Sequence, residues 1–413
     1  MRVLAAPHGI ALAHITRPLE VAKVLRARGH EVVFTCSAAY ASLIEQAGFR
    51  NLPIVTEDPA KALARMREGK RYRDDAQMLD AYVRDELRII EETRSDLVLG
   101  DMRPTLGIST EIARLPYVAI LNACFTKYYA AHHEPPETWP MTRWLGRTLS
   151  RIVVPRIQMM GLKVMAAPFR KYRREHGLLP IETVLDVMES PFLNLIVELP
   201  QFAPLREDRP ANVRYVGPIL WQPDAPAPAW LTALPPERKL VYVTLGSTGE
   251  RGGTLAKILE ALQPLDVEVA FTGNAGQGGL PPNVHAMTLA PGLDLARRAA
   301  VVICHAGSGT IYQAFAGGAP VLCLPTFIEQ EFHADRAVAL GAGLKLAPRR
   351  VTAGAVREAC RTILGAASFR VRARELAEEI SKPEWDAPRK AADLIESFVS
   401  EHGGARSAAP GMP

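Results

Sequence analysis

The turn from His305 to Thr310 directly follows the apolar run 301–304 and combines small residues with polar side chains. The pattern predicts a strand that leads into a helix beginning near Ser308. The first N–H groups of a helix have no partner within the helix, and the helix dipole adds positive charge there. Such a turn suits an anion, most commonly a phosphate group. Turns of this kind also occur only to let a strand and a helix pack.

Within this turn, Gly307 and Gly309 allow a ligand to approach the backbone closely. His305, Ser308 and Thr310 add side-chain hydrogen-bond donors. A second turn of similar chemistry, with Ser247 and Thr248, follows the apolar run 240–245. Its hydroxyl groups could contact further phosphate oxygens.

Two titratable residues follow predicted strands in the first half of the chain. His14 lies between a strand over 3–6 and a helix that ends near Gly29, and Asp101 directly follows the apolar run 97–100. An imidazole in that position could act as a general base. A carboxylate bonded to it would hold its tautomer and stabilise its protonated form. Each residue alone could equally cap a helix or pack in a turn.

Glu329 and Gln330 follow the apolar run 321–324. Side by side, they present a carboxylate acceptor and an amide donor, which together could hold several hydroxyl groups of a polyol. Taken singly, this segment is also typical of an ordinary surface loop.

The elements that must position these residues recur in two sets of five apolar, strand-length runs with helical patterns between them. The runs are 3–6, 31–35, 97–100, 117–121 and 193–197, then 240–245, 267–272, 284–287, 301–304 and 321–324. Nearly continuous apolar strands indicate sheets covered on both faces. Alternation with helices predicts parallel sheets with right-handed crossovers. We therefore expect an α/β fold of two Rossmann-like domains facing across a cleft, with ligands at the carboxyl ends of the strands.

The chain of 413 residues is too long for one typical core, and eight prolines between 204 and 236 mark a linker. We expect an acceptor-binding domain over 1–205, the linker over 206–236 and a donor-binding domain over 237–382. A helix over 383–400 and a disordered tail over 401–413 complete the prediction.

The composition excludes several classes of protein. No run of about 18 uncharged apolar residues is present, so no spanning helix is predicted. The five scattered cysteines suit buried free thiols in a reducing cytoplasm and have no zinc-site spacing. No Gly-x-Gly-x-x-Gly follows the first strand and no Gly-Lys-[Ser/Thr] is present, which argues against a dinucleotide-dependent dehydrogenase and a Walker-type hydrolase.

Charge is unevenly distributed although the net charge is only +5. Nine basic residues and no acidic residue lie between Met141 and Arg174, interleaved with apolar residues. This pattern is compatible with a contact to a membrane surface or to a lipid-bearing acceptor. It is also compatible with a helix that has an apolar inner face and a solvated outer face. Nucleic acid is not expected, because interleaved aromatic residues and known binding motifs are missing.

Together these segments resemble the GT-B-fold nucleotide-sugar-dependent glycosyltransferases, a family that includes plant and bacterial small-molecule glucosyltransferases and macrolide glycosyltransferases. The family has His-Gly-Gly-x-x-[Ser/Thr], Glu-Ala-x-x-x-Gly-x-Pro, Pro-x-x-x-Asp-Gln and Gly-x-Gly in that order. The matching segments are His305–Thr310, Gln313–Pro320, Pro325–Gln330 and Gly341–Gly343. The match around His14 and over Arg28–Val32 is less specific.

The resemblance implies an inverting transfer of a hexose from a UDP- or dTDP-sugar to a hydroxyl group of an apolar small-molecule or lipid acceptor, without a metal or a cofactor. The turn 305–310, with Ser247 and Thr248, would bind the diphosphate. The helix dipole and the hydrogen-bond donors of the turn would stabilise the negative charge of the leaving group. Glu329 and Gln330 would hold the sugar.

On the acceptor side, the same resemblance implies that His14 deprotonates the acceptor hydroxyl group and that Asp101 orients His14. The acceptor would lie largely against the variable segment 125–180. The alternatives are another GT-B enzyme, such as a nucleotide-sugar epimerase, and a non-catalytic partner protein that keeps the fold.

Four departures from the family pattern concern this site. The family usually has Asp at the position of Glu329 and Glu at the position of Gln313. After the histidine of the first loop it usually has proline at the third position, where this chain has Arg17. The aromatic residue that stacks on the nucleobase in many members is missing from 288–291.

Overall fold

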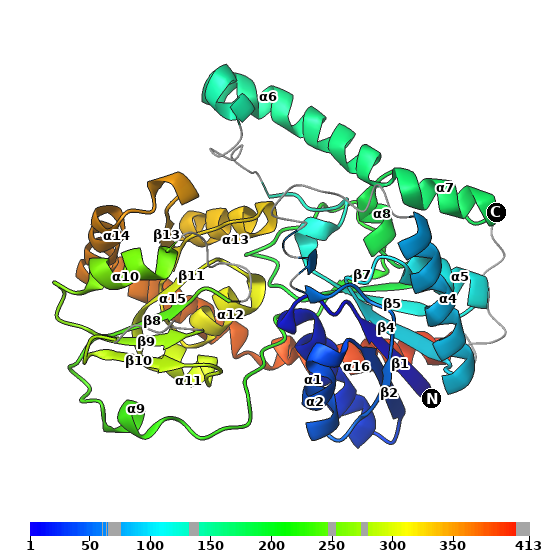
Figure 1. The fold of residues 1–413 in the computed structure, drawn as a ribbon, viewed down its shortest axis with the longest axis horizontal. Coiled ribbons are helices and arrows are strands. Elements are labelled where there is room, and N and C mark those ends of the chain that lie inside the picture. Colours follow the sequence, from blue (N-terminus) through cyan, green and yellow to red (C-terminus); the bar gives the residue numbers. More distant parts are fainter. Residues whose placement is uncertain are drawn as a thin grey trace. The chain divides into compact units, whose positions relative to one another are not determined.

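The computed structural model describes residues 1–59, 61, 62, 64, 76–131, 140–246, 253–273 and 280–401. The chain divides into two compact units, each built around a parallel sheet (Figure 1). Unit 1 comprises Met1–Ala131, Pro155–Ile219 and Glu384–Pro413, and unit 2 comprises His132–Val154 and Leu220–Pro383. The prediction of two α/β domains with parallel sheets is confirmed.

The sheet of unit 1 has the strand order β3-β2-β1-β4-β5-β6-β7. Its strands are β1 (Arg2–Pro7), β2 (Glu31–Cys36), β3 (Arg50–Pro53), β4 (Leu97–Asp101), β5 (Tyr117–Leu121), β6 (Leu193–Ile196) and β7 (Val213–Tyr215). The helices around it are α1 (Leu12–Ala27), α2 (Ala38–Gln46), α4 (Ala76–Thr93), α5 (Leu106–Ala113), η2 (Ala123–Phe125), α7 (Ala167–Glu175), α8 (Val184–Met188) and α16 (Ala387–Glu401). Helix α6 (Pro140–Met165) contributes its second half to this unit.

The sheet of unit 2 has the strand order β10-β9-β8-β11-β12-β13. Its strands are β8 (Leu240–Thr244), β9 (Glu268–Thr272), β10 (Val284–Met287), β11 (Ala299–Cys304), β12 (Val321–Cys323) and β13 (Gly343–Lys345). The helices are α9 (Ala229–Ala233), α10 (Thr254–Leu262), α11 (Gly292–Arg298), α12 (Ser308–Ala316), α13 (Ile328–Ala339), η3 (Pro348–Arg350), α14 (Ala353–Gly365) and α15 (Ala367–Ile380), followed by η4 (Pro383–Trp385).

The buried apolar strands make each sheet the centre of its unit. In unit 1, Val3, Leu99 and Ile120 form one core with α1, α2 and α16. Helix α16, at the end of the described chain, lies beside α1 at its start (Figure 1) and buries Ala391 and Ile395 in that core. In unit 2 the equivalent core joins the strands to α10 and α14. Burial of such side chains away from water is the main stabilising contribution in both units.

Three strands do not appear among the predicted runs, and all three are edge strands. They are β3, β7 and β13, which pair with β2, β6 and β12 respectively. An edge strand is covered less completely than a central one, so its sequence need not be a continuous apolar run. Strand β7 lies inside the predicted linker 206–236, so the first sheet extends further along the chain than we expected.

Two other boundaries differ from the prediction. Of the described residues, 140–154 group with unit 2 rather than with the first domain, and the chain passes between the units at Ile219 and Leu220. The predicted tail 401–413 lies, except for Glu401, outside the described residues. The five cysteines are free thiols, and four of them are buried.

The strand order reverses once in each sheet. In unit 1 the chain moves from β1 outward to β3 and then restarts at β4 on the other side of β1. In unit 2 it moves from β8 to β10 and restarts at β11 on the other side of β8. At such a switch point the loops after the two central strands diverge, and ligands bind at the carboxyl ends of those strands. His14 and Asp101 lie at these strand ends in unit 1, and the turn 305–310 follows β11 in unit 2, whereas Glu329 and Gln330 follow the next strand, β12.

Candidate active site

His14 and Asp101 meet at the switch point of unit 1. The last residue of β1, Pro7, is in register with Asp101, the last residue of β4. The backbone N–H of His8 donates to the carbonyl of Asp101 over 2.9 Å, which fixes the end of β4 against the loop that leads into α1. His14 lies in the first turn of α1, so the helix brings its ring over the end of the neighbouring strand.

The carboxylate of Asp101 is fully buried and has two partners. Nδ1 of His14 lies 2.8 Å from Oδ1 of Asp101. Arg17, one helical turn after His14, donates from Nε to Oδ2 over 2.7 Å and from Nη2 to Oδ1 over 2.6 Å. Its Nη1 donates to Oδ1 of Asn122, at the end of β5, over 2.7 Å. Arg17 was noted in the sequence only as a departure from the family pattern, and its partners became visible only in the fold.

Arg17 also restricts the tautomer of His14. Its Nη2 lies 2.9 Å from Nδ1 of His14, the same atom that lies beside Asp101. Nδ1 of a neutral imidazole can donate to the carboxylate or accept from the guanidinium, but it cannot do both. Only the first arrangement leaves Nε2 free to accept a proton. The two partners of Nδ1 therefore compete for the state in which His14 can act as a base.

The loop after Asp101 is held in place by buried hydrogen bonds to Glu86 of α4. Met102 has a φ of 56°, a left-handed conformation that is costly for a bulky residue. The next residue, Arg103, is buried and donates from Nε to Glu86 of α4 over 2.5 Å. Thr105 and Ser109 donate to the same carboxylate. Strained backbone of this kind persists only where the surroundings determine it, which is common at functional sites.

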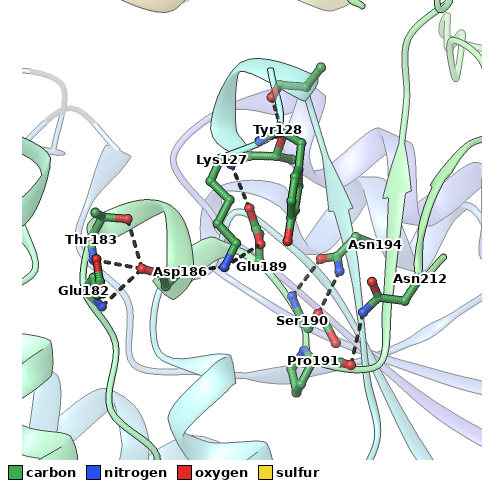
Figure 2. A network of polar contacts seen from close by, with 12 residues as sticks. Lys127, Tyr128, Glu182, Thr183, Asp186, Glu189, Ser190, Pro191, Asn194 and Asn212 are labelled. Atoms are coloured by element: carbon green, nitrogen blue, oxygen red, sulfur yellow. Dashed lines mark hydrogen bonds and ion pairs between the residues drawn. The ribbon is translucent and has the colours of Figure 1, made fainter. Parts of the chain in front are cut away.

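A second polar network holds the segment after β5, which begins with Asn122 (Figure 2). The backbone N–H of Lys127 donates to Glu189 over 2.9 Å, and its Nζ donates to Asp186 over 3.1 Å. Burial raises the pKa of Glu189. In Figure 2 the Lys127 side chain lies between the two carboxylates. This network holds the segment that follows Asn122 against α8 and the residue after it.

The turn from His305 to Thr310 leads from β11 into α12 as the sequence predicts. Gly307 is the N-cap residue and carries no side chain, so it provides no side-chain cap to the first amides of α12. Ala306 has a φ of 65° and is fully buried, at a position where the family has glycine. Both candidate loops thus contain a left-handed non-glycine residue immediately after the residue of interest, Met102 after Asp101 and Ala306 after His305.

The ring of His305 lies between two glycines. A Cβ on Gly307 would lie 2.5 Å from Nε2 of His305, and a Cβ on Gly246 would lie 2.6 Å from its Cε1. Gly246 also has a φ of 58°, which favours glycine. Gly246 follows β8, the strand next to β11, and was not among the predicted site residues. The glycine directly before Ser247 and Thr248 was the only signal in the sequence.

His305 is neutral in the folded protein at physiological pH. Burial lowers its pKa to about 4, although a hydrogen bond to the backbone of Thr244 acts in the opposite direction. Nδ1 of this ring is buried and has no hydrogen-bond partner among the described residues. A neutral imidazole can donate or accept a hydrogen bond but brings no positive charge to a bound anion.

This pKa predicts how the stability of the protein depends on pH. The folded-state pKa of about 4 lies below the ordinary value of 6.5, so the unfolded chain binds a proton first as the pH falls. The contribution is complete above pH 6.5 and is lost as the pH falls towards 4. Between pH 7 and pH 5, we expect wild type to lose about 2 kcal/mol more unfolding free energy than His305→Gln. Urea unfolding at both pH values measures this difference, and equal losses would contradict the assignment.

The remaining predicted donor-site residues have different surroundings. Ser247 and Thr248 lie outside the described residues. Gln330 is buried, and its Oε1 accepts from the N–H of Thr326 over 2.8 Å and from that of Phe327 over 3.3 Å. This contact shapes the start of α13. Glu329 is half-exposed beside it.

Gln313 has a structural contact that the sequence did not reveal. Its Nε2 donates to the carbonyl of Trp221 over 2.5 Å, which ties α12 to the segment that enters unit 2. The neighbouring Gln222 accepts from the N–H of Leu293 over 3.2 Å at the start of α11. A Cβ on Gly292 would lie 2.6 Å from Oε1 of Gln313. The amide that stands in place of the family's Glu therefore packs tightly against α11 and the entering segment.

Comparison with known proteins agrees with this architecture. Residues 256–395 match the family model described as the C-terminal domain of erythromycin biosynthesis protein CIII-like proteins. The chain is 32% identical over 380 residues to a PGL/p-HBAD biosynthesis glycosyltransferase of Mycobacterium tuberculosis, covering 91% of this chain and 88% of the relative. It is 31% identical over 392 residues to a PGL/p-HBAD biosynthesis rhamnosyltransferase of Mycobacterium bovis, covering 94% and 86%.

A solved structure, the spinosyn rhamnosyltransferase SpnG complexed with thymidine diphosphate, has the same fold. The TM-score is 0.68 at 21% identity, over 96% of this chain and all of that chain. The sequence motifs, the two parallel-sheet units and the full-length relatives agree. The chain therefore belongs to the GT-B-fold family of nucleotide-sugar-dependent glycosyltransferases and is a glycosyltransferase.

Proposed function

We propose that this glycosyltransferase moves a hexose, with inversion, from a dTDP- or UDP-sugar to a hydroxyl group of an apolar small-molecule or lipid acceptor in natural-product biosynthesis. His14 is the general base, Asp101 orients it, and the turn from His305 to Thr310 binds the diphosphate. The observation that carries this proposal is the 2.8 Å contact between Nδ1 of His14 and the buried carboxylate of Asp101.

The geometry supports the following chemistry. Nε2 of His14 accepts the proton of the acceptor hydroxyl group while that oxygen attacks the anomeric carbon. The bond from this carbon to the diphosphate oxygen breaks, and the electron pair leaves with the nucleoside diphosphate. The new bond forms on the face opposite the leaving group, so the anomeric configuration inverts. The imidazolium that forms is stabilised by Asp101.

On the donor side, the developing charge of the diphosphate would meet the first N–H groups of α12 and the positive end of the helix dipole. The imidazole of His305 and the hydroxyl groups of Ser308 and Thr310 are further hydrogen-bonding groups of the same turn. Preorganised groups of this kind stabilise a charge without reorganising during the reaction. Glu329 and the amide of Gln330 would hold the sugar hydroxyl groups.

Two observations favour a dTDP-sugar over a UDP-sugar. The similar SpnG structure contains thymidine diphosphate, and one relative is named as a rhamnosyltransferase. We therefore propose dTDP-rhamnose as the first donor to test.

The experiment measures donor binding, transfer and stereochemistry separately. Saturating dTDP should raise the melting temperature, because a ligand that binds only the folded protein stabilises it. Transfer from a dTDP-hexose to a phenolic or hydroxylated lipid acceptor should release dTDP in equal amount to the product. The glycosidic bond of the product, read by NMR, should have the configuration opposite to that of the donor. Retention of configuration would overturn the proposed mechanism.

A further inference from the structure

Helix α6 has an exposed stripe of apolar and basic residues. At 3.6 residues per turn, six of its residues fall within an arc of about 100° on one face. They are Leu149, Ile152, Arg156, Met159, Met160 and Lys163, and all six are exposed. The exposed fractions of Ile152 and Met160 are 56% and 61%. Helices of soluble proteins normally turn such a stripe inward.

Some residues of α6 and α7 that face away from the stripe are buried against the rest of the protein. Val154 and Ala166 are buried, and on α7 Phe169 is buried in a small core with α4, α5 and α8. The guanidinium of Arg173 is also buried and pairs with Glu111 of α5. The stripe is therefore not the side by which α6 and α7 attach to unit 1. Contiguous exposed apolar surface of this kind marks an interaction site.

The charges around the stripe are positive. Arg156 and Lys163 lie within it, and Arg170, Lys171 and Arg174 are exposed on α7. No acidic residue occurs from 141 to 174. Lys171 lies 3.8 Å from Glu175, and Lys163 lies 4.0 Å from Glu182. These exposed pairs neutralise the positive charge only weakly.

The same observations decide which occupant the surface suits. A second copy of the chain in a two-fold dimer would place equal positive charges against each other. A membrane-spanning role is compatible by length and composition with the stretch Thr148–Glu175. However, its end is held in unit 1 by Phe169 and Arg173, and Arg156 and Lys163 would lie in the hydrocarbon. An anionic lipid surface satisfies both the apolar stripe and the positive charges.

We propose that the exposed stripe of α6, with the basic residues of α7, docks this protein on an anionic membrane surface. The helix lies in the plane of the interface, with Ile152, Met159 and Met160 among the acyl chains and Arg156 and Lys163 at the headgroups. This proposal does not depend on the sugar-transfer mechanism.

The test is co-sedimentation of the full chain with vesicles of phosphatidylcholine alone or with about one third phosphatidylglycerol. We expect binding to the anionic vesicles that weakens as salt rises from about 0.1 M to about 0.5 M, because screening shortens the range of the charges. The double variant Met159→Ser/Met160→Ser should lose binding at both salt concentrations. Lys163→Gln should weaken binding about fivefold at low salt.

Matched controls separate this surface from general effects. Val371→Ser replaces an exposed apolar residue on α15, and Lys257→Gln removes an exposed positive charge on α10; both should bind as wild type does. Circular dichroism and dTDP binding verify that each variant is folded. No binding of wild type, salt-insensitive binding, or wild-type binding by the double methionine variant would overturn the proposal. A dimer in sedimentation equilibrium that the methionine variant abolishes would assign the surface to a second copy instead.

Discussion

His14→Ala is expected to lower kcat for sugar transfer by about a thousandfold while the Kd for dTDP stays unchanged. The physical reason is that His14 supplies the proton acceptor at the end of β1, whereas the diphosphate-binding turn belongs to unit 2. Donor affinity, from calorimetry with dTDP, and turnover, from dTDP release with acceptor present, measure the two effects independently.

His30→Ala is the matched control for this variant. His30 lies beyond the far end of α1 in the same unit, where its Nε2 bonds to Glu396 over 2.7 Å. Its loss should leave turnover near wild type. Turnover of His14→Ala within a factor of about three of wild type would reject His14 as the base, whatever the donor affinity.

Arg17→Met provides a second readout of the same assignment. The substitution removes the guanidinium that lies 2.9 Å from Nδ1 of His14 and neutralises Asp101. Without this guanidinium, the buried carboxylate of Asp101 loses the partner that fixes its position beside His14, so kcat in the dTDP-release assay should fall while the Kd for dTDP stays unchanged. Arg173→Met removes another arginine–carboxylate pair of unit 1, between the buried Arg173 and the half-buried Glu111. It should lower stability, because it leaves the Glu111 carboxylate without its positive partner, but kcat should stay near that of wild type.

Gly307→Ala is expected to raise the Kd for dTDP by about tenfold to a hundredfold. The new Cβ would lie 2.5 Å from Nε2 of His305, so the ring must move away from the turn. Loss of one hydrogen bond to a charged group costs about 1.5–3 kcal/mol, which corresponds to this range. The backbone φ of Gly307 is −65°, so the effect does not arise from backbone strain.

A double-mutant cycle tests whether the effect acts through His305. In the His305→Ala background the added methyl group has no ring to displace, so Gly307→Ala should cost little further affinity. Gly354→Ala is the matched control, because a Cβ there has open space on α14. Additive losses in the double variant would mean that the methyl group blocks the ligand directly and that His305 is not the contact.

The sequence alone was sufficient for the fold class and for the order of the motifs. Central parallel strands are covered on both faces, so 97–100 and 301–304 had to be continuous apolar runs. The turn after β11 could be read locally because its glycines and the start of α12 are neighbours in the chain. The edge strands β3, β7 and β13 were missed because an edge needs no such run.

Only the tertiary structure decided which side chains share a site. His14 and Arg17 lie on α1, Asp101 ends β4 and Asn122 follows β5. Strand order, which no local pattern encodes, brings them together. The same holds for Gly246, which matters because β8 lies beside β11 and the His305 ring fills the space a Cβ would need. Local propensity and burial can be inferred from short stretches of sequence, whereas contacts between residues far apart in the chain depend on how strands are ordered in a sheet.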